Sequence, residues 1–516
     1  MGINLIACDR DHSFVIPQDI REWLPPEHLC WKVLDAVDEM DLSAFKAGYR
    51  ADGQGHAAYP PGVLLALIVY CCSKGVRSSR RIEAACLDDV GCRVITANHR
   101  VDHATVARFL RRHGPALNAL FVQVLALCDR RGLVDLTAVA VDGSPMEANA
   151  ARFSNRSLER LETIISQSEA GIAGLMEETA AYAQAVESGE VGEAREPPRE
   201  SSATARLSRL SDRLARACSA REYLYARARP SAGEIRIKVE AAERMVVRAE
   251  KRLAAVTAAH QAKLDGYARR TREDQASGWR AANGRPPVPL DASVVVGRRR
   301  ARLARAGAWL EGARSPRPVP SPTARASLSD PDSRLMLDKH GGYLQGYNLQ
   351  LASARNQLLL AIELQDGPSD MTALVPVVEQ AERNRTAAGI TDEVQAWLAD
   401  CGYASTANFE ALAGLPLFVA LAREGPHSGA PRLDRDAVPA GQRAMAERLD
   451  TPAGRSLYRR RASLVEPGFA QLFQRFGRHL NCRSTGRVDT EIKLLGTVHN
   501  LNKCFRHSPK SSPLTE

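Results

Sequence analysis

The sequence predicts an α/β core that is preceded by an all-α region and interrupted by a long helical insertion. Three observations predict this: helix-start signals in the first 130 residues, apolar β-rich runs near 140 and beyond 340, and an Ala/Glu/Arg/Leu-rich stretch between them. The 516 residues allow three or four domains at roughly 100–200 residues each. Hydrophobic residues make up 44% and charged residues 25%, which excludes a wholly disordered or collagen-like chain.

The first 130 residues read as short helices joined by tight turns. Pro25-Pro26 and Pro60-Pro61 favour helix starts because proline is tolerated in a first turn. Ser79 and Asp102 are expected to cap two more helices. The expected helices are 27–37, 62–73, 80–87, 103–112 and 116–129. This pattern is typical of a helix-turn-helix bundle.

Basic residues cluster in that region and give it two interpretations. The DNA-binding candidates are Arg80, Arg81, Arg108 and Arg111. Arginine suits phosphate because its guanidinium binds two oxygens at once. A solvated helix face is the alternative, and a codon bias toward arginine would also explain the composition.

Apolar β-rich runs indicate the strands of the core. The first, 137–141, stops at Asp142. Further strands are expected at 343–353, 357–364, 393–398 and 416–421. Helices are expected at 371–385, 406–413, 457–479 and 489–506.

The stretch between the first two strands has a different character. Residues 155–265 carry helical spacing and predict two to four long helices, with a coiled-coil hairpin as one arrangement. Residues 261–320 hold 13 Lys/Arg against 5 Asp/Glu, while the whole chain has a formal charge of +10. We expect a basic Pro/Arg-rich linker here, with Arg298, Arg299 and Arg300 as DNA-binding candidates. A disordered, solvated tether is the alternative.

The cysteines and the N-terminus indicate the compartment. The 11 Cys are scattered without a C-x-x-C pair, which argues against a disulfide scaffold or a zinc ribbon. The start, MGINLIACDRDHSF, lacks the features of a signal peptide, and the longest apolar run, 63–72, is too short to span a bilayer. We expect a protein of the reducing cytoplasm, without membrane contact.

Three carboxylates are the candidate catalytic residues. Asp142 and Asp400 each follow an expected strand, and the carboxyl ends of parallel strands meet at one edge of a sheet. Glu466 lies on an expected helix 66 residues after Asp400. Three carboxylates without clustered His or Cys suit Mg²⁺ or Mn²⁺ rather than Zn²⁺, and two such ions support phosphodiester chemistry. Acidic residues after strands are also common helix caps.

The blocks VAVDGSPMEANA, DPDSRLMLDKHGGYLQGYNLQLA, LADCGY and YRRRASLVEPGFAQLFQRFGRHLNC carry a resemblance. With the helical N-terminus, they resemble a DDE transposase of a bacterial insertion sequence, from the insertion-sequence-four-like group. The resemblance implies a ribonuclease H-like core: a five-stranded mixed sheet flanked by helices. It also implies a catalytic triad of Asp142, Asp400 and Glu466 that holds two Mg²⁺ or Mn²⁺ ions.

The resemblance further implies DNA partners, namely the element ends and target DNA, and a homodimer on DNA. Tyr458 and Arg461 would contact the phosphate backbone. Two departures stand out: Arg459, Arg460 and Arg461 all precede the glutamate, and no lysine follows it within two turns. His499-Asn500 could pack near the site, and for His499 a structural role is preferred.

The leading hypothesis is a transposase that binds terminal inverted repeats and catalyses metal-dependent DNA cleavage and strand transfer. The alternatives are an inactive or domesticated copy that only binds DNA, and a structural protein with a nuclease-like fold. The expected organisation is a DNA-binding domain (1–130), the first core strand (131–154), the insertion and linker (155–330), the rest of the core (331–507) and a disordered tail (508–516).

Overall fold

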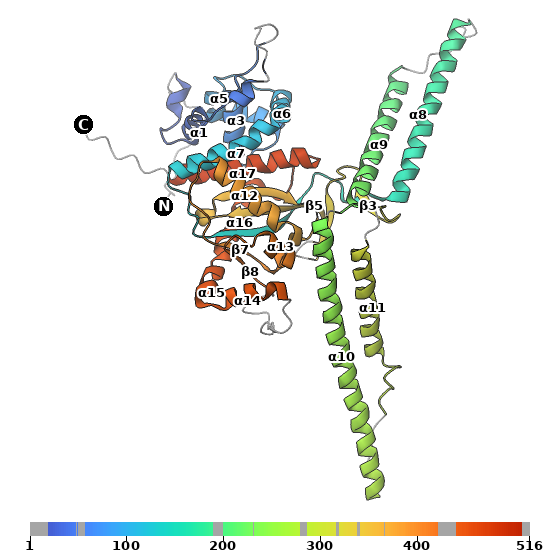
Figure 1. Cartoon of the computed structure of the whole chain (residues 1–516). Helices are drawn as coiled ribbons and strands as arrows, with labels where there is room; N and C mark the ends of the chain where they lie inside the picture. The colour runs from blue at the N-terminus through green and yellow to red at the C-terminus, as the bar shows by residue number, and fades with distance from the viewer. Residues whose placement is uncertain are drawn as a thin grey trace, which may run out of the picture.

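The computed structural model describes residues 19–47, 49, 57–188, 200–230, 232–278, 286–315, 319–337, 341–365, 367–421 and 440–507. These residues form a body of helices around one sheet, from which two helical hairpins project in opposite directions (Figure 1). The tail expected at 508–516 lies outside the described residues. Among the described helices, none is long and apolar enough to cross a membrane.

The N-terminal region is helical, as expected. Its elements are η1 (Ile20–Trp23), α1 (Leu29–Asp38), α2 (Ser43–Lys46), α3 (Pro61–Ser73), α4 (Ser79–Asp88), α5 (Val90–Ile95), α6 (His103–Arg112) and α7 (Gly114–Arg130). Asp102 caps α6, since its carboxylate accepts the Thr105 N–H at 2.9 Å. The expectation for Ser79 is wrong: α4 begins one residue earlier, because Ser78 holds the extended N-cap conformation.

The N-terminal helices share one hydrophobic core with the sheet. The apolar helix α3 is buried almost throughout and packs against α1 and α17 (Thr485–His507). Helix α7 packs along α17 as well. A Cβ on Gly496 of α17 would stand 3.0 Å from the Phe121 ring of α7, so these helices touch closely. The region up to residue 130 is therefore joined to the core by continuous packing.

The central sheet is mixed and has six described strands, not the expected five. The strands are β1 (Val139–Glu147), β4 (Arg334–Leu337), β5 (Tyr343–Ser353), β6 (Leu359–Gln365), β7 (Trp397–Ala399) and β8 (Leu417–Val419). The order is β4-β5-β1-β7-β8, and β6 also pairs with β5. The extra strand arises because β5 is long: its first residues pair with β4 and its later residues pair with β6.

The sheet combines parallel and antiparallel strands around β1. Strand β1 runs antiparallel to β5 and parallel to β7, which runs parallel to β8. Strand β1 is longer than expected: it continues past Asp142 to Glu147, because β5 provides partners along its whole length. Asp142 therefore lies inside the strand rather than at its end.

Helices cover both faces of the sheet. Met146, Leu349 and Ile362 point to the face covered by α16 (Arg461–Phe476) and α17. The short helix η4 (Asp370–Thr372) and the following α12 (Leu374–Ala387) lie on the other side. The remaining core elements are η3 (Arg355–Gln357), η5 (Cys401–Tyr403), α13 (Thr406–Ala411), η7 (Ala440–Gln442), α14 (Arg443–Asp450) and α15 (Pro452–Arg459).

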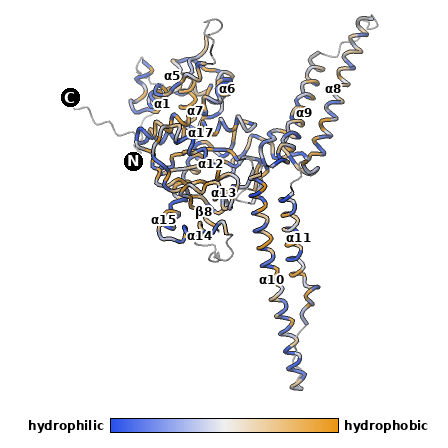
Figure 2. Tube along the Cα trace, in the orientation of Figure 1, coloured by the Kyte–Doolittle hydropathy of each residue, from blue (hydrophilic) through white to orange (hydrophobic). Residues whose placement is uncertain are grey.

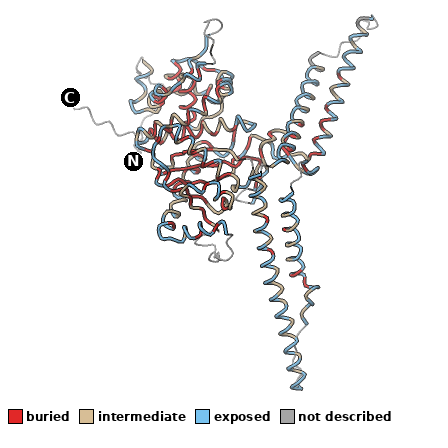
Figure 3. The backbone as a smooth tube through the Cα atoms, in the orientation of Figure 1, coloured by how far each residue is buried: buried red, intermediate tan, exposed pale blue. Residues whose placement is uncertain are grey.

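The insertion forms two separate antiparallel hairpins. One pairs α8 (Leu158–Glu187) with α9 (Glu200–Arg227), above η2 (Arg152–Ser154) and a ribbon of β2 (Asn155–Ser157) and β3 (Arg325–Ser327). The other pairs α10 (Ala232–Ser277) with α11 (Val294–Arg314). Hydrophilic and hydrophobic residues mix along both hairpins, and most hairpin residues are exposed or half-buried, whereas buried residues concentrate in the body (Figures 2 and 3).

The expectation of a basic linker over 261–320 needs correction. Most of its described residues are helical, within α10 and α11. Arginine and alanine are the commonest residues of this stretch, and both favour helix. Small side chains such as Ala242 and Ala306 form the buried contact line of the hairpin.

The described cysteines are free, and most are buried. Cys71 and Cys92 approach each other to 3.5 Å between sulfur atoms in the N-terminal helices.

Candidate active site

Asp142 is the first acidic residue of the site. Its side chain leaves β1 on the face covered by α16 and is 22% exposed. One carboxylate oxygen accepts the Gly143 N–H at 2.9 Å, and the other accepts a hydrogen bond from Arg461 Nη1 at 3.1 Å. Burial raises the pKa of Asp142, and the charge of Asp400 raises it further, while Arg461 opposes both effects.

Asp400 leaves the neighbouring strand at the same end. Val141 of β1 pairs with Ala399 of β7, so the two aspartates follow matched positions on parallel strands. Asp400 caps η5, with its carboxylate accepting the Gly402 N–H at 2.7 Å. Asp400 lies near enough for its charge to contribute to the raised pKa of Asp142. The joint catalytic role of these two carboxylates stays a prediction.

Tyr458 and Arg461 complete this cluster. Arg461 is the first residue of α16, and its side chain is 17% exposed against Asp142. Burial alone would lower the pKa of Arg461, but Asp142, Tyr458 and Asp400 together raise it. Burial raises the pKa of Tyr458 to about 12; Arg461 opposes this and Asp400 adds to it.

The three consecutive arginines make different contacts. Arg461 meets Asp142, Arg460 donates to Thr137 Oγ1 at 3.3 Å, and Arg459 is exposed.

Glu466 does not join the cluster in this structure. It lies on α16, but the buried face of that helix carries Leu464, Val465 and Phe469, and the Glu466 side chain is exposed. Across the described parts of the chain, no three His, Cys, Asp or Glu side chains lie close enough together to hold a metal ion.

The oxygen ligands of the acidic pair suit a divalent cation. Asp142 and Asp400 offer hard carboxylate oxygens, which Mg²⁺ and Mn²⁺ prefer. Burial and the charge of Asp400 both disfavour the ionised form of Asp142, and a divalent cation between the two carboxylates would stabilise it. These two residues would therefore hold the ion, which would supply charge for activating an oxygen nucleophile on a phosphodiester.

A polar network behind the site was not found by sequence reasoning. Asp370 of η4 accepts hydrogen bonds from Asn348 Nδ2 and Gln350 Nε2 of β5, both at 2.8 Å. Tyr403, which is fully buried, donates its hydroxyl to Gln350 Oε1. Through Tyr403 this network fixes the turn that follows Asp400.

Gly143 makes room for the network. A Cβ at this position would stand 2.3 Å from both Asp370 Oδ1 and Gln350 Nε2. The available sequence signal was weak: a glycine after Asp142, and two amides at alternate positions of an otherwise apolar strand.

The insertion also reaches the site, through α10. Glu240 accepts hydrogen bonds from Thr406 N at 2.9 Å, Thr406 Oγ1 at 3.1 Å and Gln442 Nε2 at 2.9 Å. Arg244 donates to Ala404 O at 2.9 Å and contacts Met371 Sδ at 3.7 Å. The segment that follows Asp400 is therefore held from outside by α10.

The DNA-binding candidates lie away from this cluster. Arg80 and Arg81 of α4 and Arg108 and Arg111 of α6 are exposed, on two helices that pack together. Arg298 and Arg300 are exposed on α11, whereas Arg299 is half-buried. Among the described residues, no hydrogen bond or ion pair joins any of these side chains to Asp142.

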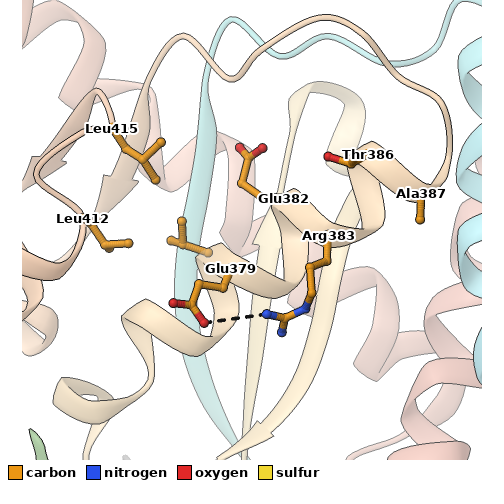
Figure 4. A pocket seen from close by; sticks show the side chains of 8 residues that line it. Glu379, Glu382, Arg383, Thr386, Ala387, Leu412 and Leu415 are labelled. Carbon is orange, nitrogen blue, oxygen red and sulfur yellow. Dashed lines mark ion pairs between the residues drawn. The ribbon is translucent and has the colours of Figure 1, made fainter.

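One cavity of the core is unrelated to the acidic cluster. It measures about 530 Å³ and is lined by α12 and by residues near α13, among them Glu379, Arg383 and Leu412 (Figure 4). Glu379 and Arg383 form an ion pair at 3.7 Å. Neither Asp142 nor Asp400 lines it.

Comparisons with known families agree with the layout of the chain. Residues 18–112 match the family described as Transposase domain (DUF772), and residues 319–502 match the Transposase DDE domain. The two matches together span more than half of the chain and leave the paired hairpins between them. Searches of the curated proteins and of the solved structures found no match. A DDE domain implies a ribonuclease H-like core and generally uses divalent metal ions. The chain is an insertion-sequence DDE transposase, an enzyme of the family that cuts DNA and joins DNA strands.

Proposed function

We propose that this transposase binds the terminal inverted repeats of an insertion sequence and catalyses metal-dependent cleavage and strand transfer. The observation that carries the proposal is the convergence of Asp142 and Asp400 from adjacent parallel strands, beside Arg461 and Tyr458. Two Mg²⁺ or Mn²⁺ ions are the proposed cofactors. The strand order β6-β5-β1-β7-β8, with β5 antiparallel, supports assignment to the ribonuclease H-like fold.

Glu466 is proposed as the third carboxylate. It lies on the helix that begins at Arg461, about 7.5 Å further along the helix axis. Its exposure means that the triad is incomplete without DNA or metal, so we propose that Glu466 joins the site in the complex. Arg461 and Tyr458 are proposed to contact the phosphate that is cut, because both already face the acidic pair.

DNA is proposed to bind at two basic surfaces. One carries Arg80, Arg81, Arg108 and Arg111; the other is the exposed side of α11, which includes Arg298 and Arg300. Cutting both element ends calls for two protomers, so we propose a homodimer on DNA. We also propose that the protein belongs to the insertion-sequence-four-like group and acts in the bacterial cytoplasm.

A cleavage assay on a cognate element end with Mg²⁺ tests the triad. Asp142→Asn, Asp400→Asn and Glu466→Gln are each expected to abolish cleavage while end binding persists. Asp392→Asn is the matched control, because Asp392 is an exposed aspartate shortly before β7. Wild-type cleavage by a folded Asp142→Asn or Asp400→Asn protein would overturn the site; wild-type cleavage by Glu466→Gln would remove only the third ligand.

The α11 surface has an internal control. Replacing Arg298 and Arg300 by Gln is expected to flatten the salt dependence of DNA binding, because each phosphate contact contributes roughly 0.9 to the slope. Replacing the half-buried Arg299 should change it less. An unchanged slope in the Arg298/Arg300 variant would exclude this hairpin from DNA contact.

A further inference from the structure

A second cavity lies where the N-terminal helices meet the core, and it is lined by cations. It measures about 420 Å³ and is formed by the end of α3, the second half of α16 and the last turns of α17. Lys74, Arg475, Lys503 and Arg506 contribute positive charge. No acidic residue is among the residues that line it.

Three of these cations have no ion pair among the described residues. Lys74 is paired with Asp89, but no acidic partner within 4.0 Å is found for Arg475, Lys503 or Arg506 in the described chain. Arg475 Nη1 is buried and makes no hydrogen bond to any described group. A buried, unpartnered guanidinium N–H is costly unless something accepts its hydrogen bond.

The electrostatics of the cavity agree with this reading. Burial, Arg506 and Arg475 together lower the pKa of Lys503 to about 8. Burial and then Arg506 lower the pKa of Arg475 as well. The cations thus repel one another inside a partly closed space, which an anion would relieve.

Polar side chains complete the lining without adding charge of either sign. His499 is buried, and its ring bonds to Gln357 O at 2.8 Å. Its pKa is lowered to about 4 by burial, so the ring is neutral at pH 7. Asn502 reaches Ser73 of α3 at 3.3 Å, which ties the two walls together.

From these observations we propose that this cavity, which we call the α3–α17 pocket, binds a phosphate group through Arg475, Lys503 and Arg506. Phosphate matches the site because its oxygens accept several charge-assisted hydrogen bonds at once. Arg475 lies 14 residues after Arg461 on α16, about 21 Å along the helix axis. The pocket is therefore distinct from the acidic cluster and takes a phosphate other than the one that is cut.

A competing explanation is that the cations merely complement helix C-termini. Arg475 lies in the last turn of α16, and Arg506 in that of α17, where the macrodipole favours positive charge. The two explanations predict opposite changes in the stability of the Arg475→Gln protein. If the dipoles hold the cations, Arg475→Gln destabilises the protein and phosphate has no effect. If the pocket binds phosphate, Arg475→Gln leaves the free protein as stable or more stable, and phosphate stabilises only the wild type.

Inorganic phosphate is the first probe, applied to the full chain at constant ionic strength against chloride. We expect phosphate to raise the unfolding temperature, and Arg475→Gln and Lys503→Met to weaken phosphate binding roughly tenfold or more, as expected for loss of a charge-assisted hydrogen bond. Arg487→Gln is the matched control, because it removes an exposed arginine of α17 outside the pocket. A phosphate effect that is absent, or equal in all four proteins, overturns the proposal.

Binding to a short DNA duplex is the second probe, and it distinguishes a DNA phosphodiester from free phosphate as the ligand. Only this second experiment rests on the proposed function. The salt slope of binding to a short duplex should fall by about 0.9 in each single variant, and by the same amount in the double variant, because one phosphate is lost in each case. A preserved slope with lost phosphate binding assigns the pocket to free phosphate. Asp400→Asn should leave both phosphate binding and the salt slope of duplex binding unchanged. Failure of the cleavage proposal would therefore not affect the assignment of the pocket.

Discussion

The contact between α10 and the segment after Asp400 makes a sharp prediction about catalysis. Glu240→Ala removes the acceptor for the first backbone N–H of α13 and for two side-chain donors. Arg244→Met removes the hydrogen bond to Ala404 O. The Glu240 side chain is only 16% exposed, so its hydrogen bonds are partly shielded from water.

The expected magnitude follows from these bonds. A hydrogen bond to a charged group contributes about 1.5–3 kcal/mol. Arg244→Met removes one such bond and so releases about 1.5–3 kcal/mol of local anchoring, and Glu240→Ala, which removes three, releases more. That energy is enough for the Asp400 turn to sample other positions, and a displacement of about 1 Å in a catalytic group can cost 10²-fold in rate. We expect the cleavage rate in preformed complexes to fall roughly 10- to 100-fold, with a higher Mg²⁺ concentration for half-maximal rate.

The assay is single-turnover cleavage on preformed complexes, together with end binding and thermal unfolding. Arg248→Met is the matched control, since Arg248 is exposed one turn further along α10. Glu240→Gln keeps an acceptor oxygen and should recover part of the rate, which a simple loss of folding would not show. Folded Glu240→Ala and Arg244→Met proteins that cleave at the wild-type rate and Mg²⁺ dependence would refute the reasoning.

Three further predictions concern stability and metal. The pKa of His499 is lowered from 6.5 to about 4 in the folded protein, so the unfolded chain binds the proton more readily as the pH falls. The free energy of unfolding should therefore fall by about 3 kcal/mol between pH 6.5 and pH 4. Urea unfolding should show a smaller loss for His499→Gln. Gly143→Ala places a Cβ 2.3 Å from Asp370 Oδ1 and should lower the free energy of unfolding by about 1–3 kcal/mol. Gly312→Ala, on the open side of α11, should stabilise the protein slightly. Equal unfolding midpoints for the two variants would contradict this prediction. Chelating divalent ions should stop cleavage but leave duplex binding, and cleavage that persists in chelator would contradict the metal assignment.

The first elements of the site could be predicted because their signals are local. Asp142 and Asp400 each come directly after a buried apolar run, and strand direction alone brings these two runs side by side at matched positions. Tyr458 and Arg461 came from a motif near Glu466, and the structure brings both to the acidic pair. The exposure of Glu466 could not be predicted, because it depends on how α16 is rotated about its axis.

The supporting residues escaped prediction because their partners are far away in the chain. Glu240 bonds to Thr406, 166 residues later, and Asp370 meets β5 through two amides that look like ordinary strand residues. The linker expectation failed for a different reason. Arginines and prolines within 261–320 favoured a linker, although much of the stretch is alanine and arginine, which favour helix.

The place of the hairpins in the chain also governs how the protein is made. Strands β1 and β5 are direct neighbours at the centre of the sheet, yet roughly 200 residues lie between them. At synthesis rates of about 5–20 residues per second, β1 waits about 10–40 s for its partner. During that interval each hairpin can form from local contacts, while the apolar edge of β1 has only the N-terminal helices for cover. The central sheet of this enzyme therefore forms late in synthesis, and the pairing of β1 with β5 should be the slowest step of folding.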